Sequence, residues 1–179
     1  MFDLFKKKEP TTKIIDKVWM EEAVKFQSLV EEWKKDNTII YIFWFDETLR
    51  NAASFFAKEV TEPAQLVTAR EASSAFLKGK NIIFAEHYPL LQKEKELYQK
   101  LNLEKVNVWS ALDEPLFQIF GSEKIIQLMK QLGMKENESV QHTMLSKSIQ
   151  NAQDKIEKKV QVEHTAHSQK DWFEINLIK

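Results

Sequence analysis

A run of eight residues, positions 38–45, contains only β-branched and aromatic side chains: Thr, Ile, Ile, Tyr, Ile, Phe, Trp and Phe. A strand with one solvated face alternates apolar and polar side chains, and this run shows no such alternation. The run therefore predicts a strand buried on both faces, as in a parallel sheet covered by helices. Because side chains alternate along a strand, we expect Phe43 and Phe45 on one face and Ile42 and Trp44 on the other.

Strand-like and helix-like segments alternate along the first two thirds of the chain. Shorter β-rich runs follow at residues 65–68, 81–85 and 106–110. Apolar residues at three- and four-residue spacing predict helices over residues 18–35, 47–58, 69–77 and 90–101. Such alternation predicts right-handed crossovers and a parallel sheet with helices on both faces. We therefore expect one α/β domain over residues 13–134.

From Pro115 onward the pattern becomes purely helical. One or two helices are expected up to Gly133, followed by a polar link and a helix over residues 142–160. Ser168, with Asp171 three residues later, predicts a capped final helix over residues 172–178. Residues 135–179 should thus form a helical extension, and residues 1–12 a flexible N-terminus. An apolar stripe on the 142–160 helix should pack on the α/β body; its members are Met144, Leu145, Ile149, Ala152 and Ile156.

The composition excludes several kinds of chemistry. The chain of 179 residues has no cysteine, so it has no disulfides, thiolate metal ligands or cysteine nucleophiles. Its three glycines are too few for a glycine-rich phosphate loop. Only Arg50 and Arg70 offer the planar fork that binds phosphate in a bidentate way, and the formal net charge is -1. We expect no nucleic-acid partner, no cofactor and no metal.

The sequence contains no apolar run of transmembrane length and no secretory signal at its start. Phe2 and Phe5 lie beside three lysines, a combination that suits either a solvated terminus or contact with an anionic membrane surface. The N-terminus is therefore the single candidate for membrane contact. We expect a cytoplasmic protein.

Two strings in the last third of the chain carry a family resemblance. Residues 112–134 read LDEPLFQIFGSEKIIQLMKQLGM, and residues 144–157 read MLSKSIQNAQDKIE. The first resembles the segment that closes the second nucleotide-binding domain of SecA, the preprotein translocase motor ATPase. The second is similar to the start of that motor's long scaffold helix. The resemblance implies a RecA-like fold for the α/β domain, followed by a scaffold-like helical extension.

Other parts of the chain depart from the motor's pattern. The motor carries a Walker lysine and an acidic magnesium ligand in a first nucleotide-binding domain, and nothing in the 179 residues matches these. Its second domain carries strings that contain glycine and arginine, whereas residues 86–101 contain neither. Phosphoryl transfer needs fixed donors around the γ-phosphate and usually an arginine. Because these parts are absent, the resemblance implies a non-catalytic relative of the motor, without ATPase activity. We expect an interaction or regulatory module with a protein partner, which is the motor, one of its clients or a second copy of this chain.

The carboxyl edge of the predicted sheet offers an alternative function. Asp46, His87 and Ser110 follow or end three of the expected strands, and open α/β sheets bind ligands at this edge. If the three converge, His87 could act as an acid or base oriented by Asp46, in a small enzyme or a nucleotide- or ligand-binding protein. The competing interpretation is structural: Asp46 and Ser110 cap helices, and His87 belongs to a surface loop.

The final helix carries Trp172 and Phe173, whose apolar side chains need cover. They either complete the packing of the extension on the α/β body or form an exposed anchor for a partner. The nearby pair His164 and His167 is too small a set for a metal site, so solvated histidines are expected.

Overall fold

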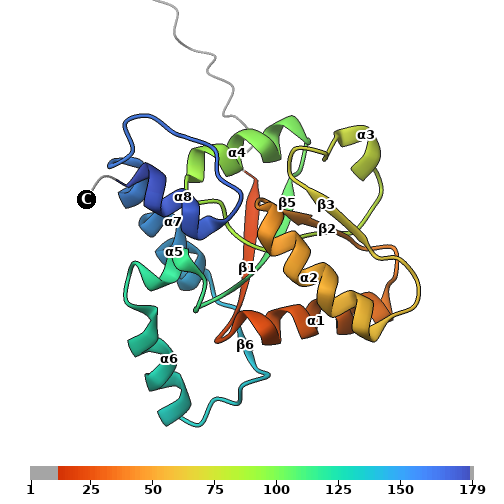
Figure 1. Ribbon diagram of the computed structural model, residues 1–179, viewed down its shortest axis with the longest axis horizontal. Helices are drawn as coiled ribbons and strands as arrows, with labels where there is room; N and C mark the ends of the chain where they lie inside the picture. Colours follow the sequence, from red (N-terminus) through yellow and green to blue (C-terminus); the bar gives the residue numbers. More distant parts are fainter. Residues whose placement is uncertain (1–11, 178–179) are drawn as a thin grey trace, which may run out of the picture.

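The apolar run forms strand β2 (Ile40–Phe43), and all four of its residues are buried in the computed structural model, which describes residues 12–177. β2 pairs in parallel with β3 (Gln65–Thr68) and β4 (Ile82–Phe84). β4 pairs in parallel with β5 (Lys105–Ala111). The four expected strands thus lie in one parallel arrangement, and the predicted α/β class is confirmed (Figure 1).

Two further strands were not expected. β1 (Lys13–Trp19) pairs in parallel with β5, and the short β6 (Ser139–Val140) pairs antiparallel with β1. Within residues 12–177 the sheet has six strands in the order β3-β2-β4-β5-β1-β6. The prediction that a helix begins at residue 18 was wrong. Val18 belongs to β1, and α1 spans Glu22–Lys35. The error arose because Val18 and Met20 fit the apolar stripe of a helix.

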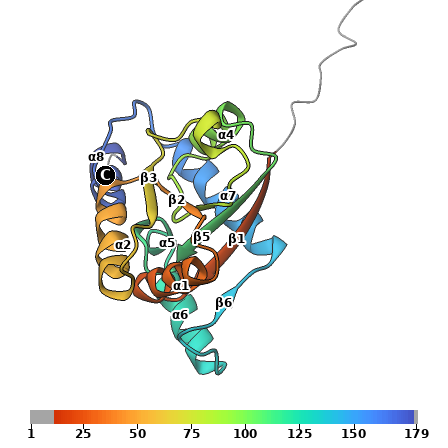
Figure 2. The same cartoon turned by 90° about the vertical axis from the view of Figure 1, so that its right-hand side faces the viewer.

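Helices cover both faces of the sheet (Figure 2). On one face, α1 and α2 (Asp46–Glu59) pack on Tyr41 and Phe43. On the other face, α3 (Ser74–Leu77) and α4 (Leu91–Lys100) pack on Ile40 and Ile42. The expected alternation holds within β2, and Trp44 packs against the cluster that contains Ile42, as predicted. Phe45 lies beyond the end of β2 in a separate cluster from Phe43, so that part of the prediction was wrong. The helix expected over residues 69–77 is limited to α3, and residues 69–73 form turns and irregular structure.

Apart from β6, the last third of the chain is helical, and it packs at the carboxyl edge of the sheet. Its helices are α5 (Pro115–Gln118), α6 (Ser122–Gln131), α7 (Thr143–Glu157) and α8 (Gln169–Asn176). The Ser168 hydroxyl accepts a hydrogen bond of 3.0 Å from the Asp171 amide, so the predicted cap is confirmed, although α8 begins earlier than expected. On α7, Ile149 and Ile156 are buried, whereas Met144 is 69% exposed because it lies in the first turn of the helix, so its place in the inward stripe was wrong.

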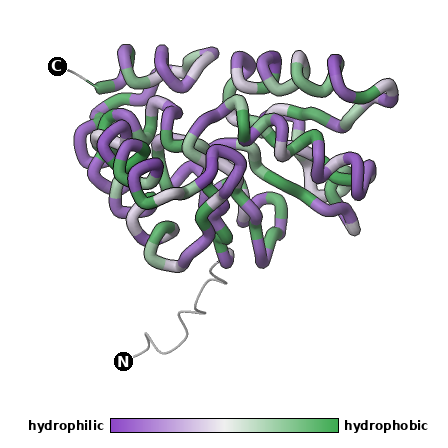
Figure 3. The backbone as a smooth tube through the Cα atoms, turned by 90° about the horizontal axis from the view of Figure 1, so that it is seen from below, coloured by the Kyte–Doolittle hydropathy of each residue, from purple (hydrophilic) through white to green (hydrophobic). Residues whose placement is uncertain are grey.

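The distribution of hydropathy fits this layered architecture. Turns of the outer helices alternate between hydrophobic and hydrophilic residues, as amphipathic helices do (Figure 3). None of the helices between residues 12 and 177 combines the length and apolar character that a membrane crossing requires. The expectations of a flexible N-terminus over residues 1–12 and of membrane contact there concern residues that, except for Thr12, lie outside the described part of the chain.

Candidate functional site

The segment that leaves β4 at the carboxyl edge of the sheet is held by side chains from distant parts of the chain. Ala85, Glu86 and His87 are all at most 1% exposed, and Tyr88 is half-buried. Pro89 follows directly, and the residue before a proline favours an extended backbone. These four residues, 85–88, are called the edge segment below. They form the candidate functional site because open α/β sheets bind ligands at this position.

His87 lies between two buried carboxylates. Its Nε2 atom is 2.8 Å from Oδ1 of Asp16 on β1, and its Nδ1 atom is 2.9 Å from Oε1 of Glu94 on α4. Burial by itself would lower the pKa of His87, but the charges of Glu94 and Asp16 outweigh it and hold that pKa well above 6.5. Burial would likewise raise the pKa of Asp16, yet the charge of His87 and its hydrogen bond hold it below the usual value. The arrangement is therefore an imidazolium between two carboxylates.

This arrangement leaves no free lone pair on the His87 ring. A charged imidazole donates from both nitrogens, and both N–H groups already have carboxylate acceptors. A general base must accept a proton from the substrate through a free nitrogen. His87 therefore fits a structural crosslink between β1, the edge segment and α4 better than an acid or base.

Glu86 binds the start of α2. Its Oε1 atom accepts hydrogen bonds of 2.8 Å from the amides of Trp44 and Phe45, and its Oε2 atom accepts one of 2.8 Å from the Thr48 hydroxyl. The residue at the N-cap position of α2, Phe45, cannot cap the helix with its own side chain. Glu86, which follows β4, thus fixes the backbone just before α2 and the side chain of its third residue. Burial raises the pKa of Glu86 to about 8, against the opposing charge of Lys25.

A buried lysine fixes the first residue of the edge segment. Lys25 on α1 is fully buried, and its Nζ atom lies 2.8 Å from the carbonyl oxygen of Ala85 and 2.5 Å from Oε1 of Glu114. Burial would lower the pKa of Lys25, but the carboxylates of Glu114 and Glu22 hold it above 10.5. The amine therefore stays charged in the core and joins α1 to the edge segment and to the segment before α5.

The three residues expected at a ligand edge do not share a site. Asp46 is the first residue of α2 rather than its N-cap, and its carboxylate contacts Arg70 at 2.7 Å and His167 at 3.0 Å. Ser110 is fully buried within β5, so it neither emerges at the edge nor caps a helix. His87 is buried, so the surface-loop interpretation was wrong, and Asp16 and Glu94 orient it instead of Asp46.

The C-terminal tail of the chain lies over the same edge. The Gln169 side chain donates a hydrogen bond of 3.1 Å to the carbonyl of His87 and accepts one of 2.7 Å from the amide of Leu116. The Glu47 amide donates to the carbonyl of His167 at 3.1 Å, and the Tyr88 hydroxyl donates to Glu163. The tail thus occupies the space in which a ligand of the edge segment would lie.

Trp172 and Phe173 are part of the core. Trp172 is 0% exposed and Phe173 is 8% exposed, and both pack with Phe45, Leu90 and Leu116. The hypothesis that they form an exposed anchor for a partner was therefore wrong. The other alternative, that the tail completes the packing of the body, agrees with the structure. Within residues 12–177, no three His, Asp or Glu side chains are arranged to hold a metal ion.

Comparison with known proteins shows that the chain is similar to SecA proteins. It shares 53% identity over 47 residues with the protein translocase subunit SecA of Acidithiobacillus ferrooxidans, which is 26% of this chain and 5% of that protein. The SecA of Ehrlichia canis is 51% identical over 47 residues, again 26% of this chain and 6% of that protein. The SecA of Nitrosomonas europaea is 30% identical over 116 residues, which is 63% of this chain and 12% of that protein. This chain is related to SecA.

The relation to SecA covers a small part of each relative. The matched segments span between 5% and 12% of the lengths of these SecA proteins. No family model matches the chain. The relation confirms the resemblance drawn from the sequence, and the mostly parallel, helix-covered sheet is consistent with a RecA-like fold.

Sequence reasoning missed most of the charged residues that hold the edge segment. Lys25 precedes Leu29 and Trp33 at four-residue steps, so it lies on the apolar stripe of α1. Glu94 likewise precedes Tyr98 by four residues on the buried side of α4. A charge at a buried position of a helical stripe is the signal that could have found both. Asp16 had no such signal, because the strand that contains it was itself missed.

Proposed function

We propose that this SecA-related chain is a non-catalytic interaction or regulatory module of the protein-translocation machinery, without ATPase activity. The observation that carries the proposal is the occupied carboxyl edge of the sheet. The tail contacts the edge segment through Gln169 and Glu163, and the charged groups there already bind one another. A catalytic group has to reach a substrate, and these groups have no open position from which to do so.

The chemistry of phosphoryl transfer gives a second line of support. Stabilising a transferred γ-phosphoryl group requires several fixed donors and usually an arginine. Of the two arginines in the sequence, Arg70 is paired with Asp46 at 2.7 Å. Two lysines near the edge segment are likewise paired, Lys25 with Glu114 and Lys93 with Glu163. Pairing of this kind leaves little positive charge for a nucleotide.

The relation to SecA makes proteins of the translocation pathway the proposed partners. They include the motor itself, one of its clients and a second copy of this chain, with the cytoplasm as the site of action. The formal charge of -1 does not favour a nucleic-acid partner. The module would bind its partners by surface complementarity, since its own tail covers the carboxyl edge of its sheet.

A specific observation favours one alternative function, the binding of a small ligand or nucleotide. A cavity of about 540 Å³ lies beside the edge segment, and Trp44, Arg70, Tyr88 and Lys100 are among its lining residues. A ligand that binds only the folded state, at a concentration about 100 times its dissociation constant, adds about 2.7 kcal/mol to stability, so binding in this cavity would raise the melting temperature.

The two functions are separated by thermal unfolding and by capture of partners. We expect no change in melting temperature with ATP, ADP or GTP in the presence of magnesium, and retention of SecA or its clients on the immobilised full chain. A saturable rise in melting temperature with one nucleotide, without retention of any translocation protein, would favour the ligand-binding alternative. An Arg70→Gln variant, which alters the lining of the 540 Å³ cavity, should abolish such a rise.

A further inference from the structure

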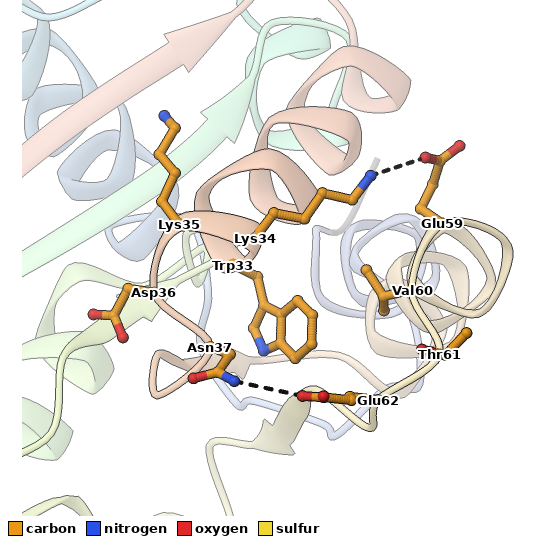
Figure 4. A pocket seen from close by; sticks show the side chains of 9 residues that line it. All are labelled: Trp33, Lys34, Lys35, Asp36, Asn37, Glu59, Val60, Thr61 and Glu62. Atoms are coloured by element: carbon orange, nitrogen blue, oxygen red, sulfur yellow. Dashed lines mark hydrogen bonds and ion pairs between the residues drawn. The ribbon is translucent and has the colours of Figure 1, made fainter.

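A second cavity lies where α1 and α2 end, away from the edge segment. It has a volume of about 620 Å³, and Figure 4 shows the side chains around it. α1 ends at Lys35 and α2 at Glu59, so the carboxyl ends of two helices border one space. We call it the helix-end cavity; its lining residues are Trp33, Lys34, Lys35, Asp36, Asn37, Glu59, Val60, Thr61 and Glu62.

Trp33 provides an unused hydrogen-bond donor in this cavity. Its side chain packs edge-on against Phe56, with ring centroids 6.2 Å apart, and it is 6% exposed. Its Nε1 atom is buried and has no hydrogen-bond partner within residues 12–177. Figure 4 shows this nitrogen on the side of the ring that faces Asn37 and Glu62. Buried polar groups in native proteins are nearly always paired, so this donor indicates that an acceptor belongs in the cavity.

The charges around the cavity favour a cation. Each of the two lysines has a carboxylate partner, Lys34 with Glu59 at 3.2 Å and Lys35 with Glu32 at 3.1 Å, and the lining residues carry three carboxylates against these two lysines. Asp36 and Glu62 have no cationic partner within the described part of the chain, residues 12–177. Asp36 accepts hydrogen bonds from Thr38 and Asn81, which hold its pKa below the usual value and keep it anionic.

The helix ends add to this negative potential. The last carbonyl groups of a helix lack intrahelical donors, and the helix dipole leaves partial negative charge there. Here two such ends meet beside Asp36 and Glu62. An indole is also the aromatic group that binds cations most strongly. A ligand that fits must therefore carry a positive charge together with a hydrogen-bond acceptor for Trp33.

We propose that the helix-end cavity binds an arginine or lysine side chain of a partner protein, with the partner's own peptide carbonyl accepting a hydrogen bond from Trp33 Nε1. The cationic group then lies beside Glu62 at the carboxyl ends of α1 and α2, and Asp36, whose carboxylate binds Thr38 and Asn81, adds negative charge from the rim of the cavity. A polyamine has the charge but no acceptor, and a carboxylate or phosphate has acceptors but the wrong charge. A peptide segment with a basic residue supplies both. This inference rests on the proposed function as an interaction module and names the chemistry of one of its partner surfaces.

Three small probes separate the two parts of the recognition. Nα-acetyl-arginine N-methylamide carries both the cation and the carbonyl groups, the citrulline analogue keeps the carbonyls but is neutral, and butylguanidinium keeps the cation alone. Each is titrated into the isotope-labelled full chain, and the five indole N–H signals are followed by NMR. The Trp33 signal is assigned from its absence in Trp33→Phe. We expect the arginine probe to shift this signal saturably, and the other two probes to bind at least about tenfold more weakly, the factor that 1.4 kcal/mol represents.

Variants test the named residues. Trp33→Phe removes the donor and should weaken binding roughly three- to tenfold, as read from the backbone amides of Asn37 and Val60. Glu62→Gln should weaken it by a similar factor, about three- to tenfold, and binding to the native chain should decrease with salt. Trp44→Phe and Glu47→Gln are matched controls, since neither residue lines the helix-end cavity, and both should leave binding unchanged.

Each remaining outcome overturns the inference. No saturable shift at probe concentrations up to about 20 mM would show that the cavity does not bind basic residues. If the citrulline analogue binds as tightly as the arginine probe, the positive charge has no role in recognition. If butylguanidinium binds as tightly, the carbonyl group has none. Failure here is distinguishable from failure of the proposed function, because the absence of nucleotide binding and the retention of translocation proteins are measured separately.

Discussion

The Nε2 atom of His87 lies 2.8 Å from the Oδ1 atom of Asp16, and both side chains are at most 2% exposed. These residues are 71 positions apart in the sequence, and their contact joins the outer half of the sheet to the edge segment. Glu94 binds the other nitrogen of the ring, so the imidazole is fixed on both sides. A second histidine, His167, makes a similar contact with Asp46 at 3.0 Å, but its side chain is 81% exposed.

The two histidine–aspartate pairs allow a matched test of burial. Asp16→Asn leaves a buried imidazolium with one carboxylate, and we expect it to lower the free energy of unfolding by about 3–5 kcal/mol. Asp46→Asn weakens the exposed pairs with His167 and Arg70 and should cost about 0–1 kcal/mol. Urea denaturation of both variants measures the difference. Equal losses would show that the buried pair does not hold the sheet and the edge segment together.

The pKa of Glu86 predicts how stability depends on pH. Its folded value of about 8 lies above the reference value of 4.5, so between these values the folded chain holds a proton that the unfolded chain releases. The contribution is therefore complete below pH 4.5 and is lost as the pH rises toward 8. The pKa of His87 is also raised in the folded chain, so its contribution to stability is likewise lost as the pH rises above 6.5. Denaturant unfolding from pH 5 to pH 9, about the span of these values, should therefore show declining stability, with a smaller slope in Glu86→Gln. An unchanged slope in that variant would contradict the assignment.

Lys25 and Glu114 should behave as a coupled pair. Lys25→Met leaves the Glu114 carboxylate buried without its cation, at a cost of about 3–5 kcal/mol. Glu114→Gln leaves the amine in the same position, so it should cost a similar amount. The double variant should lose less than the sum of the two losses, because it removes both buried charges together. Additive losses in this double-mutant cycle would mean that the 2.5 Å contact contributes no coupling energy.

The tail should contribute to stability through its aromatic residues. Trp172→Ala removes a fully buried ring from the cluster that contains Phe45 and Leu116, and we expect a loss of about 3–5 kcal/mol. Ile175→Ala on the same helix, at a residue 51% exposed, should change stability by no more than about 0.5 kcal/mol. Thermal melting compares the two. If Trp172→Ala melts like the native chain, the tail does not pack on the body in solution.

The fold could be predicted from the sequence where the pattern of side chains within a single segment was enough to identify its structure. The run around β2 has no polar alternation, and this feature alone predicted a strand buried on both faces. β1 was missed because its burial depends on partners elsewhere: Asp16 is buried by His87, and Val18 by Leu112 and Ile149. A charged residue in a strand looks solvent-exposed until the residue that neutralises it is known.

The candidate site could be predicted only in part for the same reason. The sequence indicated the position of His87 at the carboxyl edge but not its partners, which come from β1 and α4. Asp46 was expected to orient His87, yet it lies at the start of α2 and binds Arg70 and His167. The tail cover could not be predicted either, because Gln169 binds the carbonyl of His87, and no local pattern marks a contact between residues so far apart.

We propose that the chain has no catalytic activity, because its own tail and its own ion pairs occupy the carboxyl edge of the sheet. The most direct measurement is phosphate release from magnesium-ATP by the purified full chain, followed through successive purification steps. The account predicts a rate equal to that of the buffer blank in every fraction. A magnesium-dependent rate that copurifies with the protein would contradict it.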